Sequence, residues 1–131
     1  AFEAVQQLIQ FCIDNHIELI AFSPPYAPAI YTELEENGGY GYIAITTQRL
    51  QTIFDESPFL YMDFTNAQIP NTANENYLDG NHGSEFVYLN LYLELLQQSA
   101  ALQKYSDIAY LETWASAPSS KSRFDVFGMM P

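Results

Sequence analysis

The segment IELIAFSPPYAP, residues Ile17–Pro28, decides the class of fold that this sequence predicts. Five of the residues in 17–22 are apolar, and such a short apolar run is typical of a strand buried on both faces of a parallel sheet. The prolines that follow end the strand, because proline has no amide hydrogen to give to a sheet. We therefore expect a buried parallel strand at residues 17–22.

Helices are expected on both sides of this strand. Before it, apolar residues recur at three- and four-residue steps and predict an amphipathic helix; they are Phe2, Val5, Leu8, Ile9, Cys12 and Ile13. After it, a short helix at residues 29–36 and a second helix ending near Asp55 precede another apolar run, Pro58–Phe64, which we interpret as a second buried strand. The single cysteine, Cys12, cannot form an intrachain disulfide, and it is expected to pack in the apolar face of the first helix.

A long helix is predicted from Glu85 to about Lys104, with Ser84 as its N-cap. Residues 105–131 form a C-terminal extension, in which DIAYLETWA (107–115) is expected to be one more helix or an edge element. This order of elements predicts an α/β layered fold with a parallel sheet. Because two strands are few for a stable sheet, either further strands lie near the C-terminus or the chain is part of a larger sheet.

Composition and charge exclude several classes of partner. The chain has 131 residues, of which 48% are hydrophobic and 15% are charged, and this favours one globular domain over disorder. Four basic residues against 16 acidic ones give a net charge of −12, which repels nucleic acid and anionic membrane surfaces. No apolar run is long enough to cross a membrane, so we expect neither nucleic-acid binding nor membrane insertion.

Polar segments follow both predicted strands. SPPYAP (23–28) follows the first, DFTN (63–66) ends the second, and the turn Asp79–His82 comes before the long helix. Ligand sites of parallel sheets form where the carboxyl ends of the strands meet. We therefore expect these three segments to lie on one rim, with Tyr26, Asp63 and Asn81 as candidate substrate-binding residues.

The spacing Asp-x-x-His suits a general base. A carboxylate that holds one ring nitrogen of a histidine fixes the tautomer and leaves the other nitrogen free to take a proton. Asp79 and His82 are therefore the candidate catalytic residues. In the alternative interpretation, Asp79 only forms a turn and His82 is a half-exposed polar residue beside a helix cap.

Other chemistries have less support in the sequence. Ser23 is followed by two prolines, which remove the amide hydrogens that an oxyanion hole needs, and Ser84 is explained as a helix cap. Two histidines and one cysteine without ligand spacing leave only a weak oxygen-ligand metal site near Asp63 and Asp79. No glycine-rich phosphate loop is recognised, and no cofactor is expected.

Three segments resemble the SGNH/GDSL hydrolase-like superfamily. YLDGNHGSEFVYLNLYLELL (77–96) resembles the Asp-x-x-His block of that superfamily, whereas FLYMDFTN (59–66) and LIAFSPPYAPAIYTEL (19–34) resemble segments of bacterial relatives that modify cell-surface polymers. The resemblance covers residues 1–104. It implies the C-terminal portion of a flavodoxin-like αβα sandwich, with His82 as general base and Asp79 as its orienting partner. It also implies a periplasmic or extracellular, cell-envelope location and a substrate that is an acylated carbohydrate polymer or a small acyl ester.

The sequence departs from this family at the nucleophile. The Gly-Asp-Ser block and the oxyanion-hole glycine and asparagine of the family have no counterpart, and Asn37-Gly38-Gly39 does not match them. Two functions therefore stay open. The chain is either an esterase or acyltransferase domain whose nucleophile lies elsewhere, or a non-catalytic module that binds a glycan or a protein through Tyr26, Tyr31 and Tyr77. In both cases, exposed strand edges favour a homo-oligomer or pairing with a missing N-terminal portion.

Overall fold

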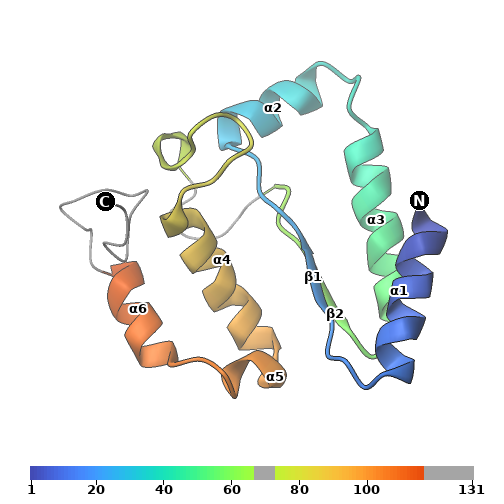
Figure 1. The fold of residues 1–131 in the computed structure, drawn as a ribbon. Coiled ribbons are helices and arrows are strands. Elements are labelled where there is room, and N and C mark those ends of the chain that lie inside the picture. The colour runs from blue at the N-terminus through green and yellow to red at the C-terminus, as the bar shows by residue number, and fades with distance from the viewer. Residues whose placement is uncertain (67–72, 117–131) are drawn as a thin grey trace.

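The computed structural model describes residues 1–66 and 73–116 as a set of helices around a small parallel sheet (Figure 1). In chain order the elements are α1 Phe2–Asp14, β1 Ile20–Ser23, α2 Pro28–Glu36, α3 Tyr42–Asp55, β2 Leu60–Asp63, the 3₁₀ turn η1 Asn74–Asn76, α4 Glu85–Gln98, α5 Ala100–Gln103 and α6 Ile108–Ser116. Part of the polar loop after β2 and residues 117–131 of the C-terminal extension lie outside the described residues.

The two strands are parallel, as the sequence predicts. Ile20 is opposite Leu60 and Ser23 is opposite Asp63. Both strands are shorter than the predicted ranges. Residues 17–19 are not part of β1, because His16 adopts a left-handed conformation (φ 54°) and the amide of Ile17 donates to the carbonyl of Cys12 at the end of α1. The apolar run at 17–19 therefore leads from the helix to the sheet.

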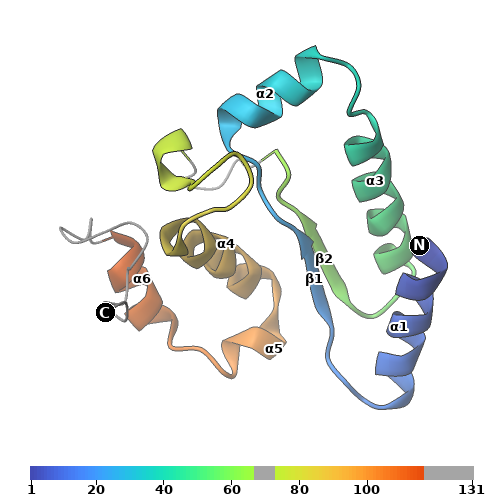
Figure 2. The same cartoon turned by 45° about the horizontal axis from the view of Figure 1, so that its top comes forward.

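Helices cover both faces of the sheet (Figures 1 and 2). Helices α1 and α3 pack on one face, where Ile9, Ile53, Phe54 and Tyr61 form a buried cluster. Helix α4 packs on the other face, where Leu91 and Leu95 contact Phe64. This arrangement follows the alternation of side chains along a strand, because Tyr61 and its neighbours Leu60 and Met62 contact opposite layers. The α/β class is confirmed.

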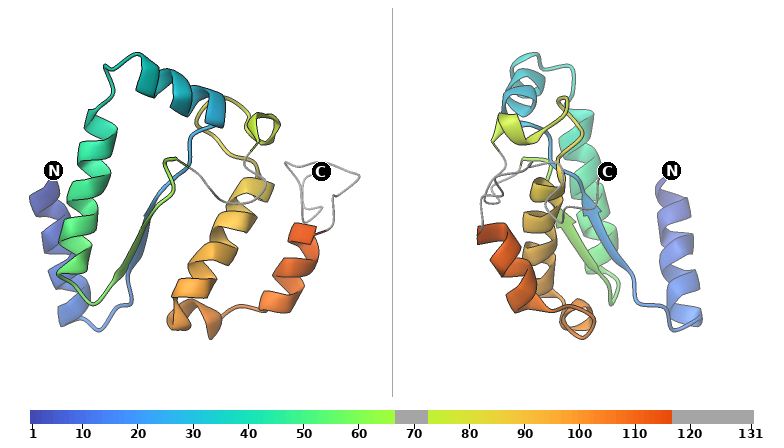
Figure 3. Two further views of the ribbon diagram at one scale, coloured as in Figure 1. Left: turned by 180° about the vertical axis from the view of Figure 1, so that it is seen from behind. Right: turned by 60° about the vertical axis from the view of Figure 1, so that its left-hand side comes forward.

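The long predicted helix is interrupted, which corrects the prediction for residues 85–104. Ser84 caps α4 as expected, since its hydroxyl accepts the amide of Val87. At Ser99 the backbone becomes extended (φ −122°, ψ 103°), and the Ser99 hydroxyl accepts the amide of Leu102 to start α5. The chain then turns so that α6 packs beside α4 (Figure 3). The segment after residue 107 is thus a helix and not an edge element. No helix among the described residues is long and apolar enough to cross a bilayer.

Part of the apolar surface of α1 stays exposed. Ile9 and Cys12 are buried as predicted, but Leu8 is 49% exposed and Ile13 is 39% exposed, and Phe11 beside them is 56% exposed. The sheet of two strands is too narrow to cover the whole apolar circumference of this helix. The predicted helix position and the packing of Cys12 are therefore confirmed, and Leu8, Phe11 and Ile13 leave apolar surface exposed.

One edge of β1 is open within the described part of the chain. The amide of Phe64 donates to the carbonyl of Ser23, so the backbone groups of Ser23 point toward β2. Because backbone groups alternate along a strand, those of Ile20 and Phe22 point away from β2. No further strand lies beside β1 among residues 1–66 and 73–116, and the Phe22 side chain is 40% exposed.

Candidate acid–base site

Asp79 and His82 form a direct pair on the surface. The Nδ1 atom of His82 lies 2.7 Å from Oδ2 of Asp79, and the side chains are 74% and 57% exposed, respectively. The other carboxylate oxygen, Oδ1, accepts the amides of Asn81 and His82, each at 2.8 Å. The Asn81 amide, followed by the ring and the amide of His82, lowers the pKa of the Asp79 carboxyl from 3.8 to about 2. Asp79 is therefore ionised at neutral pH and can only accept a hydrogen bond.

The state of Asp79 fixes the direction of this hydrogen bond. An ionised carboxylate has no proton to give, so Nδ1 of His82 must be the donor. A neutral His82 then carries its proton on Nδ1 and leaves the lone pair of Nε2 free. Because the His82 side chain is exposed, its Nε2 atom can take a proton from a bound molecule.

The turn that carries the pair is held by backbone hydrogen bonds. Tyr77 and Gly83 form an isolated antiparallel bridge, and the amide of Leu78 donates to the carbonyl of His82 at 2.9 Å. At the base of the turn, the amide of Ser84 donates to the carbonyl of Asn76 at 2.8 Å, directly before α4 begins. The position of His82 is therefore set by the turn and by the start of α4 together.

Two glycines let this turn pack closely against neighbouring helices. A Cβ atom at Gly80 would collide with the side chain of Ile30 in α2, and one at Gly83 would lie 2.9 Å from Cγ1 of Val87 in α4. Neither position has room for a larger residue without movement of the neighbour. Close contact thus favours glycine at both positions, because any larger residue displaces Ile30 or Val87.

The three predicted loop segments meet at the carboxyl ends of the strands. Two consecutive backbone amides of the β1–α2 connection hold the segments together. The amide of Tyr26 donates to the carbonyl of Thr65 after β2 (3.3 Å), and the amide of Ala27 donates to the carbonyl of Gly80 (3.0 Å). The segment that carries Asp79 and His82 is therefore attached to the same rim as the ends of β1 and β2.

The predicted substrate-binding residues are divided between two places. Asn81 is exposed beside the pair, to which it contributes its amide. Tyr26 and Asp63 instead line two hollows beside α3, and the described residues that line these two hollows do not include Asp79, Asn81 or His82. Oδ1 of Asp63 accepts both the amide and the hydroxyl of Thr65. In the described part of the chain, no group of three or more His, Cys, Asp or Glu residues is placed to hold a metal ion.

Neither of the two serines considered from the sequence pairs with His82. The hydroxyl of Ser23 lies 2.7 Å from the hydroxyl of Tyr61, and the hydroxyl of Ser84 caps α4. Tyr77, considered above as a glycan-binding residue, is 7% exposed and packs against Ala27 and Val87. Its ring cannot stack on a bound sugar, which corrects that part of the binding-module hypothesis.

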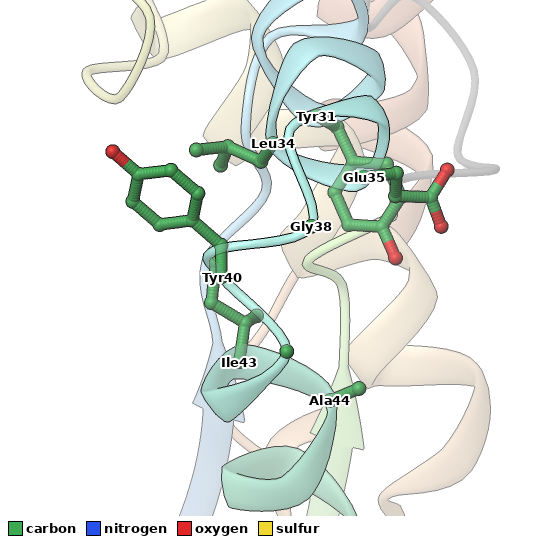
Figure 4. Close-up of a pocket in the computed structure, with 8 residues that line it drawn as sticks. Tyr31, Leu34, Glu35, Gly38, Tyr40, Ile43 and Ala44 are labelled. Atoms are coloured by element: carbon green, nitrogen blue, oxygen red, sulfur yellow. The ribbon is translucent and has the colours of Figure 1, made fainter.

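The hollows beside α3 were not predicted from the sequence. The first, about 310 Å³, lies between α2 and α3, with Tyr31 and Tyr40 on opposite sides (Figure 4). The segment NGGYGY (37–42) could have indicated this site, because tyrosines placed among glycines in a turn have few neighbouring side chains to bury their rings. Tyr40 and Tyr42 are indeed 42% and 59% exposed.

Comparisons with protein-family models, with curated proteins and with solved structures find no match to this chain. Its function is therefore inferred from its own residues and their geometry.

Proposed function

We propose that Asp79 and His82 are the acid–base pair of an SGNH-type esterase or acyltransferase, and that the chain is the C-terminal portion of a flavodoxin-like αβα domain. The substrate is an acyl group on a carbohydrate polymer or a small acyl ester, in the periplasm or at the cell envelope. The observation that carries this proposal is the 2.7 Å contact between His82 Nδ1 and Asp79 Oδ2. The layered α/β arrangement and the attachment of the pair to the strand ends also support it.

The pair acts by moving one proton. Nε2 of His82 takes the proton of an attacking hydroxyl group as the oxygen bonds to the acyl carbon. The resulting imidazolium is stabilised by the ionised Asp79 carboxylate. When the tetrahedral intermediate collapses, Nε2 returns the proton to the leaving alkoxide, and the acyl group stays on the attacking oxygen. The number of protons and electrons on the pair is unchanged at the end.

The attacking hydroxyl group comes from outside the described residues or is a water molecule. Within residues 1–66 and 73–116, the hydrogen bonds of the His82 side chain include no serine. The open edge of β1 and the exposed apolar side chains of α1 offer a surface on which a further segment of the domain can pack. In this proposal, that segment brings the nucleophile and the oxyanion hole of the full domain, whereas water activated by His82 attacks a reactive ester such as p-nitrophenyl acetate on this chain alone.

The second candidate function is a non-catalytic module that binds a glycan or a protein. It is favoured by one observation, namely that the Ser23 hydroxyl contacts Tyr61 and not His82. In that case the Asp79–His82 pair has only a structural role in the turn before α4.

Ester hydrolysis by the chain distinguishes the two functions. p-Nitrophenyl acetate is incubated at neutral pH with the unchanged chain, with His82→Ala and with His16→Ala. His16→Ala is the matched control, because His16 is the only other histidine, is also exposed and lies at the end of α1. The proposal predicts that His82→Ala lowers the rate above buffer about a hundredfold, at the low end of general-base effects, whereas His16→Ala leaves it unchanged. Equal rates for all three proteins contradict the catalytic proposal and leave the binding module.

A further inference from the structure

Three hollows lie beside α3 and share lining residues in pairs, and we call this set the α3 groove. The hollow between α2 and α3 shares Ile43 with a second hollow of about 180 Å³, which lies against Ser23, Tyr26 and Thr65. The second hollow shares Thr47 with a third of about 350 Å³, which reaches Asp63 at the end of β2. The set therefore extends from the α2–α3 corner to the rim of the sheet, with Ile43 and Thr47 as its shared lining residues.

The α3 groove has exposed aromatic rings at one end. The rings of Tyr40 and Tyr42 are 6.0 Å apart and inclined by 47°, and Tyr40 lines the first hollow while Tyr42 lines the second. Tyr31 lies across the first hollow from Tyr40 (Figure 4). Exposed aromatic rings beside a hollow suit a ligand with an apolar face and a polar edge, as the C–H face of a pyranose ring has.

Along the rest of its length the groove is lined by hydroxyl and amide groups. They come mainly from α3 and include Thr46, Thr47, Gln48 and Gln51. The hydroxyl of Thr47 donates to the carbonyl of Ala44 and the side-chain amide of Gln51 donates to Asp55, and the oxygen atoms of both side chains can still accept hydrogen bonds from sugar hydroxyl groups. The three hollows with their hydroxyl and amide groups offer separate places for successive units of a sugar chain.

The charged side chains that line the groove in the described part of the chain are negative. Glu35 lines the first hollow and Asp63 the third, and no lysine or arginine among residues 1–66 and 73–116 lines any of the three. Both carboxylates act on Tyr31, whose phenol has a raised pKa because of its burial and then because of Glu35 and Asp63. Within the field of a chain with net charge −12, an anionic glycan is repelled and a cationic one is attracted.

We propose that the α3 groove binds an oligosaccharide that carries free amino groups, with its pyranose rings at Tyr31, Tyr40 and Tyr42 and an ammonium group at Glu35. As the substrate class of the enzyme, this ligand rests on the proposed acyl chemistry, in which the acyl group is carried by a polymer of amino sugars. Binding itself does not depend on that chemistry, because the groove does not include Asp79 or His82.

Isothermal titration calorimetry with chitosan tetrasaccharide tests the proposal, at a mildly acidic pH where its amino groups are protonated. The fully N-acetylated tetrasaccharide has the same ring shape without the charge, and tetragalacturonate carries the opposite charge. We expect binding of the chitosan oligosaccharide, binding about fivefold weaker for the N-acetylated one, as the loss of an exposed charge contact predicts, and none for tetragalacturonate. Equal affinity for all three, or no binding of chitosan tetrasaccharide, overturns the proposal.

Matched variants locate the binding. Glu35→Gln is expected to remove the preference for the charged ligand, and Tyr42→Ala to weaken both chitin-type ligands. Glu33→Gln, on α2 but outside the groove, and Tyr105→Ala, an 88% exposed tyrosine in the α5–α6 connection, are expected to bind as the unchanged chain does. Equal losses in these control variants contradict the placement of the ligand in the α3 groove. His82→Ala is expected to lose ester hydrolysis and to bind chitosan tetrasaccharide with unchanged affinity. The two readouts are independent, so either proposal can fail without the other.

Discussion

The carboxylate of Asp79 holds His82 at two points, the backbone amide at 2.8 Å and the ring nitrogen Nδ1 at 2.7 Å. A single side chain thus fixes both the position of the His82 backbone and the orientation of its ring. Such fixed orientation is what distinguishes a general base from an ordinary exposed histidine, whose ring samples several rotamers.

The Asp79 carboxyl is expected to titrate at about pH 2, below its usual pKa of 3.8. Since the folded-state pKa is the lower one, Asp79 stabilises the fold above about pH 4, and this contribution is lost as the pH falls toward 2. The titration is followed by NMR of the side-chain carboxyl carbon. In His82→Ala the pKa is expected to rise but to stay below 3.8, because the amides of Asn81 and of residue 82 still donate to Oδ1. An unchanged pKa in this variant contradicts the pair.

Gly80→Ala is expected to destabilise the fold, because the added Cβ collides with Ile30. Overpacking of this kind costs about 1–3 kcal/mol in the free energy of unfolding, measured by urea denaturation. Gly39→Ala is the control, since a Cβ atom there meets nothing within 4 Å. In an Ile30→Ala background, the cost of Gly80→Ala is expected to fall. The same cost in both backgrounds contradicts the contact.

Tyr77→Phe is expected to stabilise the protein. The Tyr77 hydroxyl is buried without a hydrogen-bond partner in the described part of the chain, and removing it keeps the ring contacts with Val87. The gain is about 1 kcal/mol in the free energy of unfolding, whereas Tyr105→Phe, at an exposed position, changes it little. A loss of stability on Tyr77→Phe shows that the hydroxyl has a partner.

The same tyrosine predicts a loss of stability at alkaline pH. Burial, followed by the charge of Tyr88, raises the pKa of Tyr77 to about 12. Because the folded-state pKa is raised, the neutral phenol stabilises the fold below about pH 10, and this contribution is lost as the pH rises toward 12. Between pH 9 and 11, the unfolding temperature Tm is expected to fall less steeply with pH for Tyr77→Phe than for the unchanged chain. Parallel curves of Tm against pH contradict this expectation.

We expect the isolated chain to self-associate through the exposed apolar side chains of α1, chiefly Leu8 and Phe11. The net charge of −12 opposes this contact, so added salt is expected to strengthen it. Sedimentation velocity over a range of protein concentrations measures the species. Phe11→Glu is expected to yield a monomer, whereas Tyr105→Glu at another exposed position is not. A monomer for the unchanged chain at high concentration and high salt contradicts the expectation.

The elements themselves were predictable where local pattern and burial agree. Periodicity placed α1 and α3, the two apolar runs gave the parallel strands, and Ser84 marked the start of α4. The interruption at Ser99 was not predictable, because apolar residues continue at helical spacing as far as Leu102. Only the extended backbone of Ser99 and its hydrogen bond to Leu102 separate α4 from α5.

The site was predictable in part for a similar reason. The Asp79–His82 contact is local, since it spans three residues, and a short motif can encode it. The burial of Tyr77 depends on its contacts with Ala27, which is distant in sequence, and with Val87 in α4. The sequence alone does not reveal these contacts, so it could not predict that Tyr77 is buried. The α3 groove likewise depends on how α2, α3 and the strand ends meet.

The tautomer of His82 tests the central claim most directly, and ¹⁵N NMR of the imidazole at alkaline pH measures it. Free histidine prefers its proton on Nε2. Because the ionised Asp79 accepts a hydrogen bond from Nδ1, neutral His82 is predicted to carry its proton on Nδ1 and to revert to the Nε2 form in Asp79→Asn. A proton on Nε2 of His82 in the unchanged chain contradicts the acid–base pair, because the nitrogen that faces solvent is then no longer free to act as a base.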